Sequence, residues 1–115
     1  MDILKSFETH SCVMAYDVQV YRRWSDGFYI KIKLRLSDGS ELHVREYVDA
    51  KERDYSFHWQ TADKQMISRW DNAPHHRTVA TFPHHRHTPD GIVESSDITL
   101  DSVLNIIQWR IFPTP

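Results

Sequence analysis

Alternating apolar and polar positions run along the first two thirds of the chain and predict antiparallel β-strands. Between residues 28 and 36 the apolar side chains fall at even positions and the basic ones at odd positions, so the two kinds occupy opposite faces of a strand. Asp-Gly turns at 26–27 and 38–39 separate this segment from its neighbours. The expected strands cover residues 13–23, 28–36, 41–48, 54–61 and 66–71.

Near both ends of the chain, apolar residues recur with the spacing of an α-helix, which predicts a helix at each end. Thr99 is a suitable N-cap for a helix over 99–111, in which apolar residues recur every three or four positions. A shorter amphipathic helix is expected over 2–8. An antiparallel sheet covered on one face by the C-terminal helix is an α+β fold. We therefore expect one domain over 1–115, with a single curved antiparallel sheet of five to six strands.

The hydrophobic pattern also predicts how the strands pair. A three-residue loop with Gly39 in the left-handed position pairs Leu34 with Val44, whereas a two-residue loop would reverse the faces. This register leaves Glu46 opposite Ile32 on the apolar face, where a carboxylate needs a partner.

The second hairpin places polar candidates on one strand face. If Asp63-Lys64 forms a two-residue loop, His58 pairs with Arg69 and Ser56 pairs with Asp71. The opposite face of this hairpin is then aromatic, with Tyr55, Phe57, Trp59 and Trp70.

Composition narrows the class of protein. The net charge of −2 argues against a broadly basic nucleic-acid binder, because phosphate affinity is largely electrostatic. The single cysteine, Cys12, cannot form an internal disulfide, which favours a cytoplasmic location. No apolar run approaches the ~18 residues that a membrane helix requires, so no membrane association is expected.

Histidines are concentrated in one segment: five of the eight lie between positions 71 and 87. We expect this segment to form a histidine loop over 72–91, with an extra strand near 80–86. If 84–87 is extended, His85 and His87 share one face and His84 and Arg86 the other. Imidazoles transfer protons near neutral pH and also bind metals. The candidate site residues are Glu46, His58, Arg69, Asp71, His75, His76, His84, His85 and His87.

Three motifs resemble the TumE family of toxins. They are the segments Tyr55-Ser56-Phe57-His58-Trp59-Gln60, Arg69-Trp70-Asp71-Asn72-Ala73-Pro74-His75-His76 and Thr81-Phe82-Pro83-His84-His85-Arg86-His87. The resemblance implies a cytoplasmic toxin of a type II toxin–antitoxin pair, an RNA substrate, and a DNA-binding antitoxin as cognate partner. The acidic net charge departs from the basic character usual in RNA-cleaving toxins. A homodimer is left open.

The residues are compatible with three chemistries. In the first, two histidines act as acid and base in metal-independent RNA cleavage, Arg69 binds the phosphate, and Asp71 or Glu46 orients an imidazole; no cofactor is then needed. In the second, a divalent metal binds to the 75–87 histidine cluster and makes the protein a metal-dependent hydrolase. In the third, the protein is a binding module that uses exposed aromatic side chains, namely Tyr21, Trp24 and Phe28.

Overall fold

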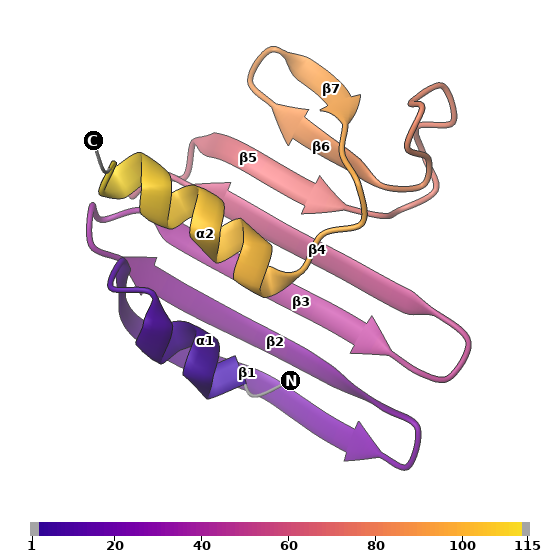
Figure 1. Ribbon diagram of the computed structural model, residues 1–115, viewed down its shortest axis with the longest axis horizontal. Coiled ribbons are helices and arrows are strands. Elements are labelled where there is room, and N and C mark those ends of the chain that lie inside the picture. The colour runs from indigo at the N-terminus through magenta and orange to yellow at the C-terminus, as the bar shows by residue number, and fades with distance from the viewer. Residues whose placement is uncertain (1–2, 114–115) are drawn as a thin grey trace.

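The computed structural model describes residues 3–113, and within them it contains two helices and seven strands (Figure 1). The elements are α1 (Ile3–Thr9), β1 (Val13–Trp24), β2 (Gly27–Leu36), β3 (Glu41–Val48), β4 (Arg53–Gln60), β5 (Met66–Asp71), β6 (His85–Thr88), β7 (Gly91–Glu94) and α2 (Leu100–Ile111).

The strands form one antiparallel sheet in which spatial order equals chain order, from β1 at one edge to β7 at the other. The α+β class and the helix on one face are therefore confirmed, but the sheet has seven strands instead of five to six. The expected loop over 72–91 is shorter, because β6 and β7 form a hairpin that begins at residue 85. Residues 80–82 form turns and not the start of the extra strand.

Both helices lie on the same face of the sheet (Figure 1). The expected N-cap is confirmed, since Thr99 Oγ1 accepts a hydrogen bond from the Ser102 backbone N–H at 3.2 Å. The buried stripe of α2 packs in the same core as the apolar face of the central strands. The large apolar side chains that are most buried are Ile32, Leu34, Leu36, Leu42, Tyr55, Phe57, Trp59, Trp70, Leu100, Leu104 and Ile107. The opposite face of the sheet has no helix over it within residues 3–113.

The β2–β3 hairpin has the expected faces but a different register. Its loop holds three residues with Gly39 at φ 86°, as predicted, and the Leu36 N–H donates to the Ser40 carbonyl at 2.8 Å. Because this hydrogen bond closes the loop at Ser40, Leu34 pairs with Leu42 and Glu46 lies opposite Ile30. The predicted pairs were therefore wrong by two positions, a shift that leaves every side chain on its predicted face.

The β4–β5 hairpin has the predicted pairs but a different turn. Ser56 pairs with Asp71 and His58 with Arg69, as expected. The loop, however, holds three residues, because the Thr61 N–H donates to the Gln65 carbonyl at 2.8 Å and Lys64 adopts φ 70°. A register shift next to Trp59 absorbs the extra residue, so the polar pairs further along the strands are unchanged.

Candidate active site

The sheet face away from the helices carries most of the predicted site. Asp71 on β5 pairs with His85 on β6, and Arg69 pairs with His87 two positions further along. His85 and His87 share a face because they are alternate residues of one strand, as predicted. Strand pairing therefore brings the second hairpin and the histidine-rich segment together.

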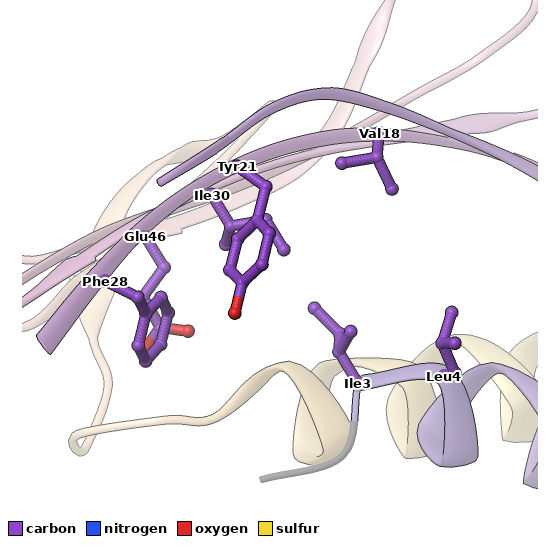
Figure 2. A pocket seen from close by; sticks show the side chains of 7 residues that line it. All are labelled: Ile3, Leu4, Val18, Tyr21, Phe28, Ile30 and Glu46. Carbon is purple, nitrogen blue, oxygen red and sulfur yellow. The ribbon is translucent and has the colours of Figure 1, made fainter. Parts of the chain in front are cut away.

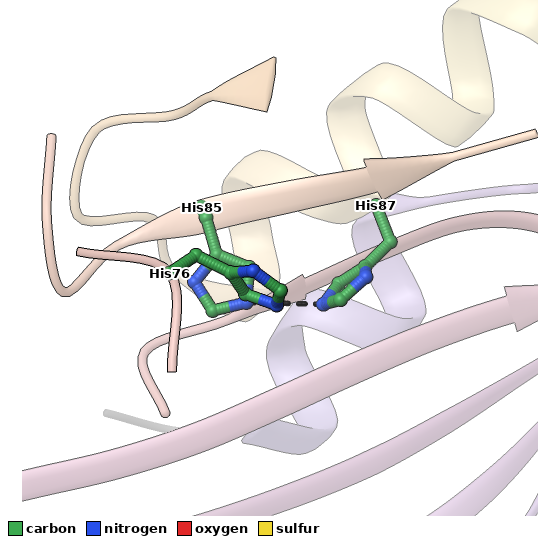
Figure 3. Close-up of side chains that lie close together, drawn as sticks. All are labelled: His76, His85 and His87. Carbon is green, nitrogen blue, oxygen red and sulfur yellow. Dashed lines mark hydrogen bonds between the residues drawn. The ribbon is translucent and has the colours of Figure 1, made fainter. Parts of the chain in front are cut away.

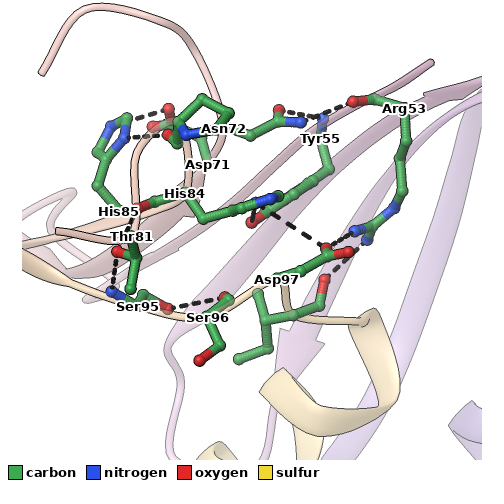
Figure 4. A network of polar contacts seen from close by, with 12 residues as sticks. Arg53, Tyr55, Asp71, Asn72, Thr81, His84, His85, Ser95, Ser96 and Asp97 are labelled. Atoms are coloured by element: carbon green, nitrogen blue, oxygen red, sulfur yellow. Dashed lines mark hydrogen bonds and ion pairs between the residues drawn. The ribbon is translucent and has the colours of Figure 1, made fainter. Parts of the chain in front are cut away.

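Asp71 lies at the centre of this group and is 5% exposed. Its Oδ1 is 3.0 Å from His85 Nε2, and its Oδ2 is 3.3 Å from His87 Nε2. Arg69 Nε donates to Oδ2 at 3.1 Å, and the Ala73 backbone N–H donates to Oδ1 at 3.0 Å. The carboxylate is thus held in one orientation by contacts from two strands and the following loop. Figure 4 shows its contact with His85.

His85 is 2% exposed, and its ring orientation is fixed from both sides. A carbonyl oxygen can only accept, so Nδ1 must carry the proton that it donates to the Pro83 carbonyl at 2.9 Å. Its Nε2 then lies 3.0 Å from His87 Nε2 and 3.0 Å from Asp71 Oδ1. The ring of His76, from the loop, lies 4.7 Å from that of His85 (Figure 3). These atoms converge on one point, where a hydrogen carried by His87 Nε2, or a metal ion, would bridge them.

Arg69 stands between two histidines whose pKa values are lowered. It pairs with His58 on one side and His87 on the other. Burial lowers the pKa of the His58 imidazole, with a further contribution from the charge of Arg69. Burial also lowers the pKa of His87, against the opposing effect of Asp71. Both rings therefore favour the neutral form, which can accept a proton.

Two candidates lie on the other face of the sheet, away from this group. Glu46 is buried on the helix side, where Arg53 Nε donates to its Oε2 at 2.6 Å. It lines an apolar pocket of about 350 Å³ between α1 and the sheet, together with Ile3, Tyr21 and Phe28 (Figure 2). The carboxylate therefore has the partner that its apolar surroundings require, and it lies on the face opposite Asp71 and Arg69.

His84 also faces the helix side. Its Nδ1 hydrogen-bonds the hydroxyl of Tyr55 at 2.8 Å and lies 3.9 Å from Asp97 Oδ1. Arg53 Nη1 donates to the same Asp97 oxygen at 2.5 Å (Figure 4). This network joins β4 to the segment before α2, and burial raises the pKa of the Tyr55 hydroxyl to about 12, which keeps it neutral.

The remaining candidates and the aromatic residues do not form a single group. His75 is exposed, and within residues 3–113 its ring makes no contact with the cluster. Tyr21 and Phe28 face the helix-side pocket, whereas Trp24 packs against Tyr47 with 5.5 Å between ring centroids.

Two contributions to the site could not be identified from the pattern of residues. His43 lies opposite His58, with ring centroids 6.4 Å apart, and could have been found only from the β3–β4 register. The Pro83 carbonyl that orients His85 is a backbone group and leaves no signal in the sequence.

Comparison with known proteins identifies a family for this chain. The family model described as Toxin TumE matches residues 3–111, which is nearly the whole chain. No curated protein and no solved structure matches the chain. Neither helix within residues 3–113 has the length and apolar character needed to cross a membrane.

Proposed function

This chain belongs to the TumE toxin family, and we propose that it is the toxin of a type II pair that cleaves cytoplasmic RNA by metal-independent acid–base catalysis. Its partner would be the cognate DNA-binding antitoxin. The observation that carries the proposal is the cross-strand series in which Arg69 lies between His58 and His87.

The charge distribution on the helix-free face supports an RNA substrate despite the net charge of −2. Strand register aligns His85, Asp71, Ser56, Arg45 and Lys31 in one row across the sheet. The next row contains His87, Arg69, His58, His43 and Lys33. The two rows run from the cluster on β5 and β6 to the basic side chains on β2, across five strands and roughly 20 Å.

Several of these cations are available to bind phosphate. Among residues 3–113, no ion pair engages Lys31, Arg35 or Arg45, and all three are exposed. Lys33 is partly neutralised by Glu41 at 3.0 Å. A single-stranded backbone laid along the rows would meet free positive charges before it reaches Arg69.

The geometry around Arg69 suits cleavage that uses the 2′-hydroxyl of RNA. His58 and His87 are two strands apart, roughly 9–10 Å between backbones, which leaves room for a phosphodiester beside the guanidinium. One imidazole would take the 2′-hydroxyl proton while O2′ attacks phosphorus. The other would protonate O5′ as the P–O5′ bond breaks, which gives a 2′,3′-cyclic phosphate and a 5′-hydroxyl end.

The supporting groups have separate tasks. Arg69 would stabilise the extra negative charge of the phosphorane, because its Nε is held by Asp71 and, among the described residues, its terminal nitrogens have no partner. Asp71 and His85 act as positioning residues, since they orient Arg69 and His87 from a buried position.

The test uses purified protein, a labelled single-stranded RNA and EDTA. Cleavage products with 2′,3′-cyclic phosphate ends are expected. His58→Ala and His87→Ala should each lower the rate about 10²–10⁴-fold. His75→Ala is the matched control, because it removes an exposed imidazole outside the cluster. Absence of cleavage, or equal loss in the control, would refute the mechanism.

A second experiment separates catalysis from partner binding. If His58→Ala and His87→Ala abolish growth arrest in cells but still co-purify with the antitoxin, the catalytic reading holds. If toxicity survives and only complex formation fails, the protein is a binding module.

A further inference from the structure

We propose that Asp71, His76, His85 and His87 form a binding site for one first-row transition-metal ion of the Zn²⁺ type, and that its binding suppresses RNA cleavage. The first half stands on the geometry of the cluster alone. The second half rests on the proposed function, because it requires that His87 take part in proton transfer.

The donor atoms of Asp71, His85 and His87 already have the separations of neighbouring ligands on one ion. His85 Nε2, His87 Nε2 and the Asp71 carboxylate oxygens are 3.0, 3.0 and 3.3 Å apart in the three pairs described above. Tetrahedral ligands at about 2.0–2.1 Å from zinc lie roughly 3.3 Å from one another. The ligand nitrogens of His76, His85 and His87 all lie within 4.8 Å of one another.

Backbone groups hydrogen-bond two of the proposed ligands and fix their orientation, as is usual in metal sites. A ligating histidine usually donates its second ring N–H to a carbonyl or carboxylate, which fixes the tautomer and points the other nitrogen at the ion. His85 does this through the Pro83 carbonyl at 2.9 Å. Asp71 is fixed in the same way by the Ala73 N–H at 3.0 Å.

The chemistry of the donors selects the kind of ion. Three imidazoles and one carboxylate favour zinc, nickel, cobalt or copper, whereas magnesium and calcium prefer oxygen ligands. The positive charge of Arg69, which bonds to Asp71, opposes any cation, so a weakly coordinated magnesium ion is further disfavoured. His76 comes from the loop between β5 and β6, so it joins the strand-held donors from a different segment.

Metal binding and proton transfer compete for the same atoms. A nitrogen that is bound to a metal has neither a lone pair to accept a proton nor a hydrogen to donate. An ion on His85 and His87 would remove one member of the proposed acid–base pair and leave His58, which is not among the donors, unaffected.

The binding experiment is calorimetric titration of chelator-treated, tag-free protein with ZnCl₂, and with MgCl₂ for comparison. One zinc per chain and no detectable magnesium binding are expected. His76→Ala and His85→Ala should weaken zinc binding by at least about tenfold. His75→Ala is the control, because it deletes a neighbouring imidazole that lies outside the donor group and should bind zinc as the wild type does. Circular dichroism checks that each variant is folded. Absence of zinc binding, or equal weakening in the His75 control, overturns the site.

The activity experiment repeats RNA cleavage at increasing zinc concentration. Cleavage should fall with a midpoint equal to the calorimetric Kd. Zinc that binds without changing cleavage overturns the suppression. Cleavage that occurs only with metal present overturns both the suppression and the metal-independent mechanism, and identifies a metal-dependent hydrolase. If no RNA is cleaved under any condition, the proposed function fails, while the calorimetric result still decides the metal site.

Discussion

Arg53 is expected to be a major stabilising residue, and Arg53→Met tests why Glu46 is buried. The guanidinium donates to Glu46 Oε2 at 2.6 Å, to Asp97 Oδ1 at 2.5 Å and to the Ile98 carbonyl at 2.8 Å. Its Cζ also lies 4.1 Å from the centroid of the Tyr55 ring. Methionine keeps the length of the side chain and removes the charge and all three bonds.

The expected loss follows from burial. The Glu46 side chain is 8% exposed and that of Arg53 is 24% exposed. Removing one partner of a buried ion pair costs about 3–5 kcal/mol, because the remaining charge has no compensation. Since Arg53 is partly hydrated, we expect the lower end of that range, about 3 kcal/mol. In the double variant Glu46→Leu/Arg53→Met the unpaired charge is gone, and the loss should shrink to about 1 kcal/mol.

Urea unfolding, followed by tryptophan fluorescence, measures both values. A loss of about 3 kcal/mol lowers the midpoint by roughly 1–2 M for a typical urea slope. A loss of less than about 1 kcal/mol in Arg53→Met, or a double variant as unstable as Arg53→Met, would show that the Arg53–Glu46 ion pair does not stabilise the fold in this way. Glu46→Gln should cleave RNA at the wild-type rate per folded molecule, because this carboxylate lies on the face opposite Arg69.

Further predictions concern pH, reactivity and the strand turn. Because the pKa values of His58 and His87 are lowered, the acid limb of kcat/KM should have its midpoint below the usual histidine value of about 6.5, and a midpoint above that value contradicts the proposed acid–base pair. Because these two histidines have lower pKa values in the folded chain, the unfolded chain binds more protons than the folded chain below pH about 6.5. The free energy of unfolding should therefore be highest above that pH and decline below it. Urea titrations should show a smaller decline for His58→Gln. Burial raises the pKa of the Cys12 thiol to about 11, so iodoacetamide should not modify the folded protein at pH 8 but should modify it in urea, as seen by mass spectrometry. A Cβ at Gly27 would lie 1.7 Å from the Val48 carbonyl oxygen, so Gly27→Ala should lower the thermal midpoint, whereas Gly39→Ala, where a Cβ meets no atom within 4 Å, should show only the smaller cost of its positive φ.

The strand faces were predictable from sequence because alternation is a local property. Each residue in an extended segment has its side fixed by its neighbours, so the basic face of β2 and the aromatic face of β4 could be identified without any knowledge of the fold. The same rule separated His85 and His87 from His84 and Arg86, and Arg86 indeed faces the helix side, with its Cζ 4.8 Å from the Trp70 ring centroid.

The site was predicted less completely because it depends on contacts between distant segments. β7 is exposed along its whole length, so it shows no burial pattern that distinguishes it from a loop. Glu46 stood out as an apolar-face carboxylate, but its partner Arg53 lies in the next strand and could not be chosen before the register was known. The central position of Asp71 likewise depends on β6 pairing with β5.

The strictly sequential order of the strands has a consequence for synthesis of the protein. Each strand hydrogen-bonds only to its neighbours in the chain, so the sheet can grow one hairpin at a time as the polypeptide leaves the ribosome. The apolar side, however, cannot close until residues 100–111 emerge and supply Leu100, Leu104 and Ile107. A nascent chain halted before that point would have its histidines on a sheet whose other face is still an exposed hydrophobic surface. We expect such a fragment to bind a hydrophobic dye and to be recognised by chaperones, and not to act as a toxin.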